Sequence, residues 1–220
     1  MCRDVPRGRA ATPTHYSSSM VGPAARTRDP ERKGKILAAA TDLIGTRGFS
    51  FVSMADIGRE SGITGSGIYR HFSSKATILV HLFEQIIDDL IIGQEAVIAE
   101  NHTPATTLTH LVDGQVSFVV DQRELARVYY NEVQNLPRDD QSRLRRKQRH
   151  YLEEWIALVG RSRPDLDEAE ARTLVHAAIG AIQSPLFHRV DLDDERLRTR
   201  LTSAALAVLG VPRRRGSTRP

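Results

Sequence analysis

Side chains that suit contact with phosphate are concentrated between positions 53 and 75. Hydroxyls, basic groups and amides at helix N-termini are common donors to phosphate oxygens, and glycine lets a backbone approach closely. The segment therefore predicts binding to a polyanion such as duplex DNA. The candidate contact residues are Ser53, Thr64, Gly65, Ser66, Gly67, Tyr69, Arg70, His71 and Lys75.

Two short helices joined by a tight turn should position these groups. Ser53 can cap the first, with Asp56 as its capping-box partner, and Gly62 suits the turn that follows. Thr64 can cap the second helix, over about 65–71. This is the helix-turn-helix layout, whose second helix can lie in the major groove of DNA. The residues spaced to pack against a preceding helix are Ala55, Ile57, Ile63, Ile68 and Phe72.

Residues 31–85 resemble the DNA-binding head of the TetR family of transcriptional regulators. A first helix, capped by Asp29 and Pro30, ends at a Gly-Phe pair, and the expected recognition helix ends in Tyr-Arg-His-Phe at 69–72. Ser-Ser-Lys at 73–75 then opens a long linking helix. The resemblance implies phosphate contacts from Ser53, Tyr69, His71 and Lys75, with residues 64–67 facing the groove.

The chain departs from the family at two positions of the recognition helix. The family often has larger side chains where this sequence has Gly65 and Gly67. Few side chains are then left to recognise bases. We therefore expect either that Arg70 carries more of the specificity, or that the shape of the DNA and the N-terminal arm do.

The remaining sequence predicts an all-α protein. A linking helix should run from Ser73 or Ser74 to about 93, and further helices over 103–121, 123–136, 139–160, 165–188 with a break at Pro185, and 193–209. No run alternates with a period of two. The expected organisation is a disordered basic tail (1–28), a three-helix DNA-binding domain (29–75), a helical-bundle body for ligand binding and dimerisation (76–210) and a basic tail (211–220).

The family resemblance implies a ligand pocket among the middle helices and a homodimer formed through the last two. Apolar walls with a few polar anchors are typical of such pockets. The candidate ligand-binding residues are Phe118, Arg127, Tyr129, Asn131, Glu132, His150, Trp155, His176 and Gln183. The candidate dimer residues are Ala177, Ala181, Leu201, Ala204, Ala205 and Val208, although these could also pack within one subunit.

The class of effector stays open at this stage. Residues 123–132, followed by an arginine-rich helix, resemble family members that sense acyl thioesters. Arg143, Arg145, Arg146, Lys147 and Arg149 could then hold an anionic head group, or could simply form a solvated face. A sensor of drug-like hydrophobic compounds that controls efflux, and a helical protein-interaction module without DNA binding, are the alternatives.

Composition argues against several other classes. No apolar stretch is long enough to span a membrane, and the N-terminus has no apolar segment of a secretory signal. The single cysteine, Cys2, excludes a disulfide framework, so we expect a cytoplasmic location. The eight histidines show no i, i+4 pair with a glutamate, and no nucleophile has the surroundings of a catalytic site. We therefore expect no cofactor, no metal and no enzymatic activity.

Overall fold

The computed structural model describes residues 30–63 and 65–211, and within these ranges the chain forms helices and no strand. The all-α prediction is confirmed. The predicted tails, the Asp29 cap and Thr64 lie outside the described residues, apart from Val211. The helices are α1 (Pro30–Arg47), α2 (Met54–Glu60), α3 (Gly65–Ile68), α4 (Lys75–Ala99), α5 (Pro104–Asp121), α6 (Arg123–Glu132), α7 (Arg138–Ser162), α8 (Glu168–Gln183) and α9 (Asp194–Leu209), with 3-10 turns η1 (Phe49–Phe51), η2 (Val133–Asn135) and η3 (Ser184–Leu186).

Local signals in the sequence define the helix-turn-helix. The Ser53 hydroxyl accepts a hydrogen bond from the Asp56 amide at 3.1 Å, and the Asp56 carboxylate accepts from the Ser53 amide at 3.0 Å, as expected for a capping box. Gly62 adopts a φ of +69° in the turn. Ile57, Ile68 and Phe72 are buried, but Ala55 is exposed, which corrects its predicted packing against α1.

The recognition helix is shorter than expected. It ends at Ile68, and Tyr69 to His71 form a hydrogen-bonded turn instead of a further helical turn. Glycines at positions 65 and 67 disfavour a helix by about 1 kcal/mol each relative to alanine, which is a large penalty for four residues.

The linking helix is longer than expected. Ser74 caps α4 through a reciprocal pair with Thr77, and the helix continues through Gly93 to Ala99. Gly93 does not end it because Gln94 is buried and Val97 packs against the core beyond it. Tertiary packing there outweighs the cost of about 1 kcal/mol for a glycine inside a helix.

The body helices begin close to their predicted caps. Thr103 caps α5 with Pro104 in its first turn, and Asp193 caps α9, which ends at the left-handed Gly210. The α8 cap is Asp167, two residues after the expected start, and the helix breaks into η3 at Pro185. None of the described helices combines the length and apolar character needed to cross a lipid bilayer.

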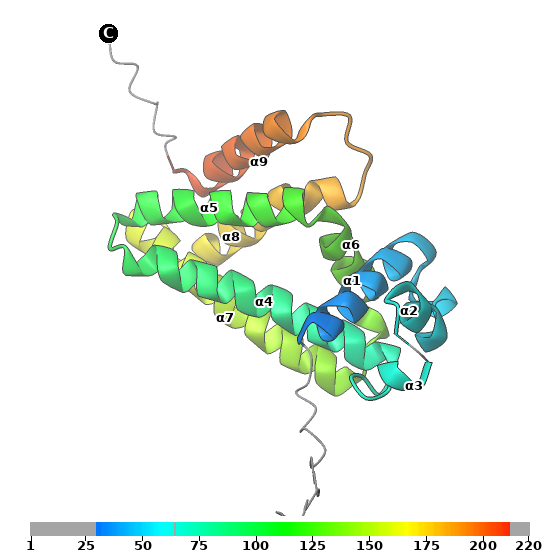
Figure 1. Cartoon of the computed structure of the whole chain (residues 1–220). Helices are drawn as coiled ribbons and strands as arrows, with labels where there is room; N and C mark the ends of the chain where they lie inside the picture. Colours follow the sequence, from blue (N-terminus) through cyan, green and yellow to red (C-terminus); the bar gives the residue numbers. More distant parts are fainter. Residues whose placement is uncertain (1–29, 64, 212–220) are drawn as a thin grey trace, which may run out of the picture.

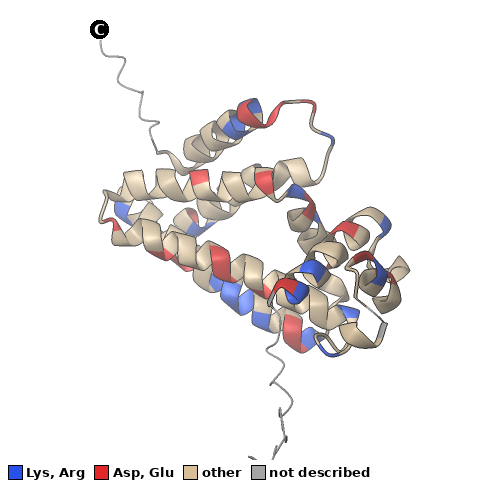
Figure 2. Cartoon of the chain, viewed as in Figure 1, with Lys and Arg blue, Asp and Glu red and all other residues tan. Residues whose placement is uncertain are grey.

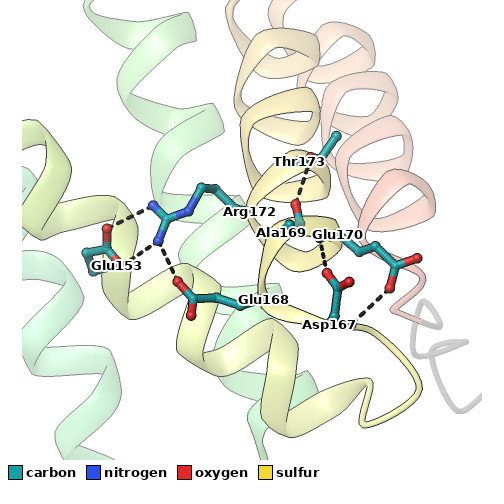
Figure 3. Close-up of polar contacts among 7 residues, drawn as sticks. All are labelled: Glu153, Asp167, Glu168, Ala169, Glu170, Arg172 and Thr173. Atoms are coloured by element: carbon teal, nitrogen blue, oxygen red, sulfur yellow. Dashed lines mark hydrogen bonds and ion pairs between the residues drawn. The ribbon is translucent and has the colours of Figure 1, made fainter.

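Charged side chains join α8 to α7. Arg172 donates to Glu153 of α7 at 2.9 Å and to Glu168, one turn before it, at 2.9 Å (Figure 3). The hydrogen bonds with Arg172 also hold the pKa of Glu153 below its ordinary value. Figure 3 also shows the capping box that Asp167 and Glu170 form at the start of α8.

Two hydrophobic cores meet along α4, which runs beside α7 from the head toward the far end of the body (Figure 1). One core joins the helix-turn-helix to the first half of α4 and to parts of α6 and α7, and the other joins α5, α7, α8 and α9. Four partly buried residues pack against both cores: Leu90, Ile91, Phe118 and Tyr130. The head thus has no core of its own that is separate from the body.

Lys75 joins the start of α4 to the turn that follows α1. Its Nζ donates to the Val52 carbonyl at 2.8 Å and to the Phe49 carbonyl, and it lies 4.4 Å from the centre of the Phe49 ring. The ammonium group is partly buried. These contacts connect the head to the linking helix.

We predict that Lys75→Met lowers the free energy of unfolding by about 1–2 kcal/mol. Hydrogen bonds to charged groups contribute roughly 1.5–3 kcal/mol, and water can recover part of this at a partly exposed site. Urea unfolding of the variant and the wild type would measure the change. Lys35→Met is the control, because Lys35 pairs with Glu31 on the surface and such a pair contributes about 0.5 kcal/mol or less. Equal losses in the two variants would contradict the structural role of Lys75.

Candidate nucleic-acid interface and ligand cavity

The predicted phosphate contacts lie around an open hollow on the head. It is formed where η1, the start of α2, the end of α3 and the start of α4 meet, and hydroxyl groups surround it. Its lining residues are Ser50, Phe51, Val52, Ser53, Met54, Tyr69, Ser73, Ser74 and Lys75. Ser53 and Tyr69 are thus brought together, and the first turn of the 25-residue helix α4 opens beside them. Free amides in such a turn favour anions.

Tyr69 and Arg70 present their side chains to solvent beside this hollow. The Tyr69 side chain is 59% exposed, which is unusual for a large aromatic residue, and Arg70 is exposed as well. Ser66 is exposed, whereas Gly67 and His71 are half-buried. The surface is therefore open to a partner, and the contacts of these residues with DNA stay a prediction.

Two polar residues of this surface are occupied by internal contacts. The Ser53 hydroxyl and amide both bond to Asp56 and hold the pKa of that carboxyl below its ordinary value. The Lys75 ammonium is bonded to two carbonyls of the head, as described above. Two of the three N–H donors of Lys75 are thus used inside the head, and its predicted contact with a phosphate stays a prediction.

A cavity of about 280 Å³ lies inside the body between the two hydrophobic cores. Ile86, Ile87 and Tyr129 come from the core shared with the head, whereas Val119, Ile179 and Leu186 come from the core of the body. Leu90, Phe118 and Tyr130, which pack against both, also line it. A ligand in this cavity would touch both cores at once.

The polar groups of the cavity are few and come mainly from α5, α7 and α8. Inside, the Tyr151 hydroxyl donates to Gln115 Oε1 at 2.8 Å, and burial raises the pKa of Tyr151. Gln148, His176 and Gln183 complete the polar lining. Apolar walls with a small number of polar groups suit a hydrophobic ligand with one or two hydrogen-bonding sites.

Four of the nine predicted ligand-binding residues line this cavity: Phe118, Tyr129, His176 and Gln183. Trp155 is not among the lining residues and is buried in the core of the body, and His150 is exposed on α7. Arg127, Asn131 and Glu132 lie instead in a second pocket, of about 290 Å³, between α1 and α6. These five residues are therefore corrected to positions outside the cavity.

Glu132 has a structural partner in the head. Its carboxylate accepts a hydrogen bond from the Phe49 amide at 3.2 Å and another from Asn135 Nδ2 at 2.6 Å. One turn earlier in α6, Val128 packs close to Gly45 of α1. Because these contacts occupy one face of α6, the neighbouring polar residues lie over the head rather than over the cavity.

The sequence interpretation missed Gln115, Tyr130, Gln148 and Tyr151. Gln115 offered a detectable signal, because it is a polar residue within the apolar pattern of α5 and is almost fully buried. A buried amide of this kind usually needs a hydrogen-bond partner. Its partner, Tyr151, lies 36 positions away in the sequence, and no local pattern connects the two.

Basic residues, drawn blue in Figure 2, lie along α7 and differ in their contacts. Arg143 bonds to Glu84 at 2.7 Å and Lys147 bonds to Asp88 at 2.7 Å, so these two hold α7 against α4. This corrects their predicted place in a rim for an anionic ligand. Arg145, Arg146 and Arg149 are exposed.

Arg145 is the basic side chain of α7 with a connection to the cavity. It lies one turn before Gln148, which lines the cavity. Burial, with a further effect of Tyr130, raises the pKa of Tyr129, and Arg145 is close enough to oppose that rise. Arg145 itself does not line the cavity, and its guanidinium donates to Gln141 Oε1 at 2.9 Å.

The candidate dimer residues also fall into two groups. Leu201 and Ala205 are buried in the core of their own subunit, which corrects their assignment to a subunit interface. Ala177 and Ala204 are exposed, and Ala181 and Val208 are half-buried. Helices α8 and α9 pack against each other. The small exposed residues on them allow close approach of a second copy of the chain.

Two family models match this chain, one over the head and one over the body. The family described as "Bacterial regulatory proteins, tetR family" matches residues 36–82, and "Tetracyclin repressor-like, C-terminal domain" matches residues 101–185. The HTH-type transcriptional repressor KstR2 of Rhodococcus jostii (strain RHA1) is 24% identical over 143 residues, which are 62% of this chain and 70% of that protein.

Solved structures of other proteins share the fold of this chain over nearly the whole length of those proteins. The ketosteroid transcriptional regulator KstR2 of Mycobacterium tuberculosis has a TM-score of 0.70 at 18% identity, covering 86% of this chain and 97% of that one. AibR, crystallised with isovaleryl coenzyme A and operator DNA, has a TM-score of 0.68 at 15% identity, covering 79% and 97%. With the head and the body both matched, the chain belongs to the tetR family of bacterial regulatory proteins.

Proposed function

We propose that this protein is a ligand-responsive transcriptional repressor that binds a palindromic operator as a homodimer and is released by a small hydrophobic effector. The observation that carries the proposal is the position of the cavity between the two hydrophobic cores, one of which includes the head. As a protein that acts on chromosomal DNA, it would work in the cytoplasm and need no catalytic group.

Release from DNA would follow from a shift in the position of α4. This helix begins at the head with Lys75 and passes the cavity at Ile86, Ile87 and Leu90. A ligand that binds better to one arrangement of the two cores favours that arrangement by its difference in affinity. In a dimer, a small movement of each α4 would change the spacing of the two heads, which must match half-sites about 34–36 Å apart.

The effector that best suits the cavity is an apolar chain with an anionic end. A space of about 280 Å³ can hold an acyl group, whereas a large charged head group would stay outside, near Arg145. The similar structures include a ketosteroid regulator and a regulator bound to isovaleryl coenzyme A. These two regulators support a hydrophobic metabolite as the effector over a drug-like compound. An acyl thioester would combine an apolar chain, which fits the cavity, with an anionic head group, which stays outside it.

We predict that Tyr69→Phe weakens operator binding by roughly five- to thirtyfold. The ring stays in place and only the hydroxyl is lost. A hydrogen bond to a charged group contributes roughly 1.5–3 kcal/mol, and water recovers part of this at an exposed site, so we expect a loss of about 1–2 kcal/mol of affinity. The operator would first be selected from a random duplex library with the full chain, and the selected sites should be two-fold symmetric. Gel shifts with that site would then compare wild type and variant.

The same variant should lose affinity for random DNA by a similar factor, because a phosphate contact does not depend on sequence. Thermal unfolding provides the control for folding. A folded variant with wild-type affinity would remove Tyr69 from the interface, and a library that yields no enriched site would contradict DNA recognition altogether.

We predict that Ala177→Arg converts the dimer into monomers. Ala177 is exposed on α8, so the variant should fold, whereas an interface there would have to bury an unpaired guanidinium at a cost of several kcal/mol. Light scattering at micromolar concentration measures the mass, and operator binding should fall with it. Ala157→Arg, at an exposed alanine of α7, is the matched control. If the Ala177 variant stays dimeric, the interface lies elsewhere.

We predict that acyl thioesters stabilise the protein increasingly with chain length until the cavity is full. Each buried methylene contributes about 0.8 kcal/mol. Thermal shift and operator release would be measured over a series of thioesters, free acids and neutral polyaromatic compounds. Stabilisation by the polyaromatic compounds alone would contradict an acyl effector and would favour a drug-like one.

Arg145→Ala and Arg146→Ala form a matched pair for the charged end of the ligand. The two positions differ by about 100° around α7, and only Arg145 lies on the side of Gln148. Thioester affinity should fall in the Arg145 variant and become less dependent on salt, with little change in the Arg146 variant. Equal effects would mean that the arginines act only through the overall charge of α7.

A further inference from the structure

Two histidines and a glutamate converge at the turn between α4 and α5. Glu100 follows the last residue of α4, His102 lies in the connection, and His110 lies on α5. His102 Nε2 is 2.8 Å from Glu100 Oε2, and His110 Nδ1 is 3.9 Å from the same oxygen. The two imidazole rings meet edge to face, with centroids 5.0 Å apart. Neither the DNA-binding surface nor the ligand cavity uses these residues.

The local backbone brings the three side chains together. Asn101 adopts a φ of +53°, a conformation that asparagine tolerates better than most residues, and its amide bonds to the Ile98 carbonyl at 3.1 Å. The chain reverses direction here, and Thr103 then caps α5. The capped start of α5 places His110 beside the connection, so the group depends on a defined turn as well as on flexible side chains.

The donor atoms lie close to the spacing that a transition-metal ion needs. One oxygen and two nitrogens lie within 4.8 Å of one another, the one such group of three found among the described residues. Zinc binds imidazole nitrogen and carboxylate oxygen at 2.0–2.2 Å, so ligand atoms at tetrahedral angles lie roughly 3.3–3.5 Å apart. The distances of 2.8 and 3.9 Å fall on either side of that spacing. Small side-chain rotations would therefore complete the geometry.

We propose that Glu100, His102 and His110 bind a divalent transition-metal ion, with Zn²⁺ as the ion that best suits two imidazoles and one carboxylate, and with water in the remaining position. The three side chains are 38% to 56% exposed, so an ion can reach them from solvent. Bound zinc would hold the end of α4 against α5. The sequence interpretation excluded a metal because it looked for an i, i+4 pair, whereas these histidines are separated by a turn of the chain.

Zinc binding would be measured by isothermal titration of untagged, full-length protein with zinc chloride, after treatment with a chelator. The expected result is one zinc ion per chain and a melting temperature that rises with zinc concentration. His110→Ala and His102→Ala should each weaken binding by at least about tenfold, because even the loss of an outer-shell partner costs 10- to 100-fold. Glu100→Gln, which keeps the shape of the side chain, should weaken it as well.

The matched control is His188→Ala. His188 is exposed, lies far along the chain, and bonds to the Arg189 carbonyl, so its loss should leave zinc binding unchanged. The titration is repeated with Cys2→Ser, since a thiolate is a strong zinc ligand. Circular dichroism confirms that each variant is folded.

Binding that persists unchanged in His102→Ala and His110→Ala would overturn the proposal, as would binding abolished by Cys2→Ser or weakened equally by His188→Ala. In any of those cases the contact between Glu100 and His102 is a surface hydrogen bond without a metal. The readout involves neither DNA nor effector, so the result is independent of the proposed repressor function.

Discussion

The arrangement of the molecule depends on the packing of α4 against two hydrophobic cores. Ile78, Leu79 and Phe83 belong to the core that includes the helix-turn-helix, whereas Leu90 and Ile91 also pack against the core of the body. A helix buried along this much of its length behaves as a stiff element, because close-packed side chains allow discrete rearrangements and resist gradual ones. The position of the head is therefore tied to the way in which the two cores meet.

The polar contacts of the head strengthen this connection. Lys75 bonds to the turn after α1, and Glu132 of α6 accepts a hydrogen bond from the Phe49 amide in the same turn. The sequence predicts a phosphate contact for Lys75 and an effector contact for Glu132, whereas in the structure both side chains bond to the head. Their internal roles leave the exposed Tyr69 and Arg70 and the first turn of α4 as the groups most open to DNA. Recognition would then depend on few side chains, in keeping with the glycines of the recognition helix.

The cavity lies where a ligand can influence both cores. Its apolar walls come from each of them, and its buried hydrogen bond between Tyr151 and Gln115 joins α7 to α5. A ligand that displaced or extended this bond would change the packing of α5 against α7, and through Phe118 and Tyr130 it would reach the core of the head. In the proposed mechanism, effector binding and DNA binding would be coupled through this packing, and the hydrogen bonds of Lys75 and Glu132 would tie the head to it.

The sequence by itself determined the features that depend on neighbouring residues. The capping box of Ser53 and Asp56, the Thr103–Pro104 start of α5 and the left-handed Gly210 after α9 all rest on contacts within about four residues, which a local pattern can encode. The tertiary structure decided the rest. Lys75 meets carbonyls 23 and 26 positions away, and Glu132 an amide 83 positions away. The orientation of Leu201 and Ala205 into their own subunit likewise followed from the packing of α9 on α5 and α8. A helical period marks which residues share a face, but only the folded chain decides what that face packs against.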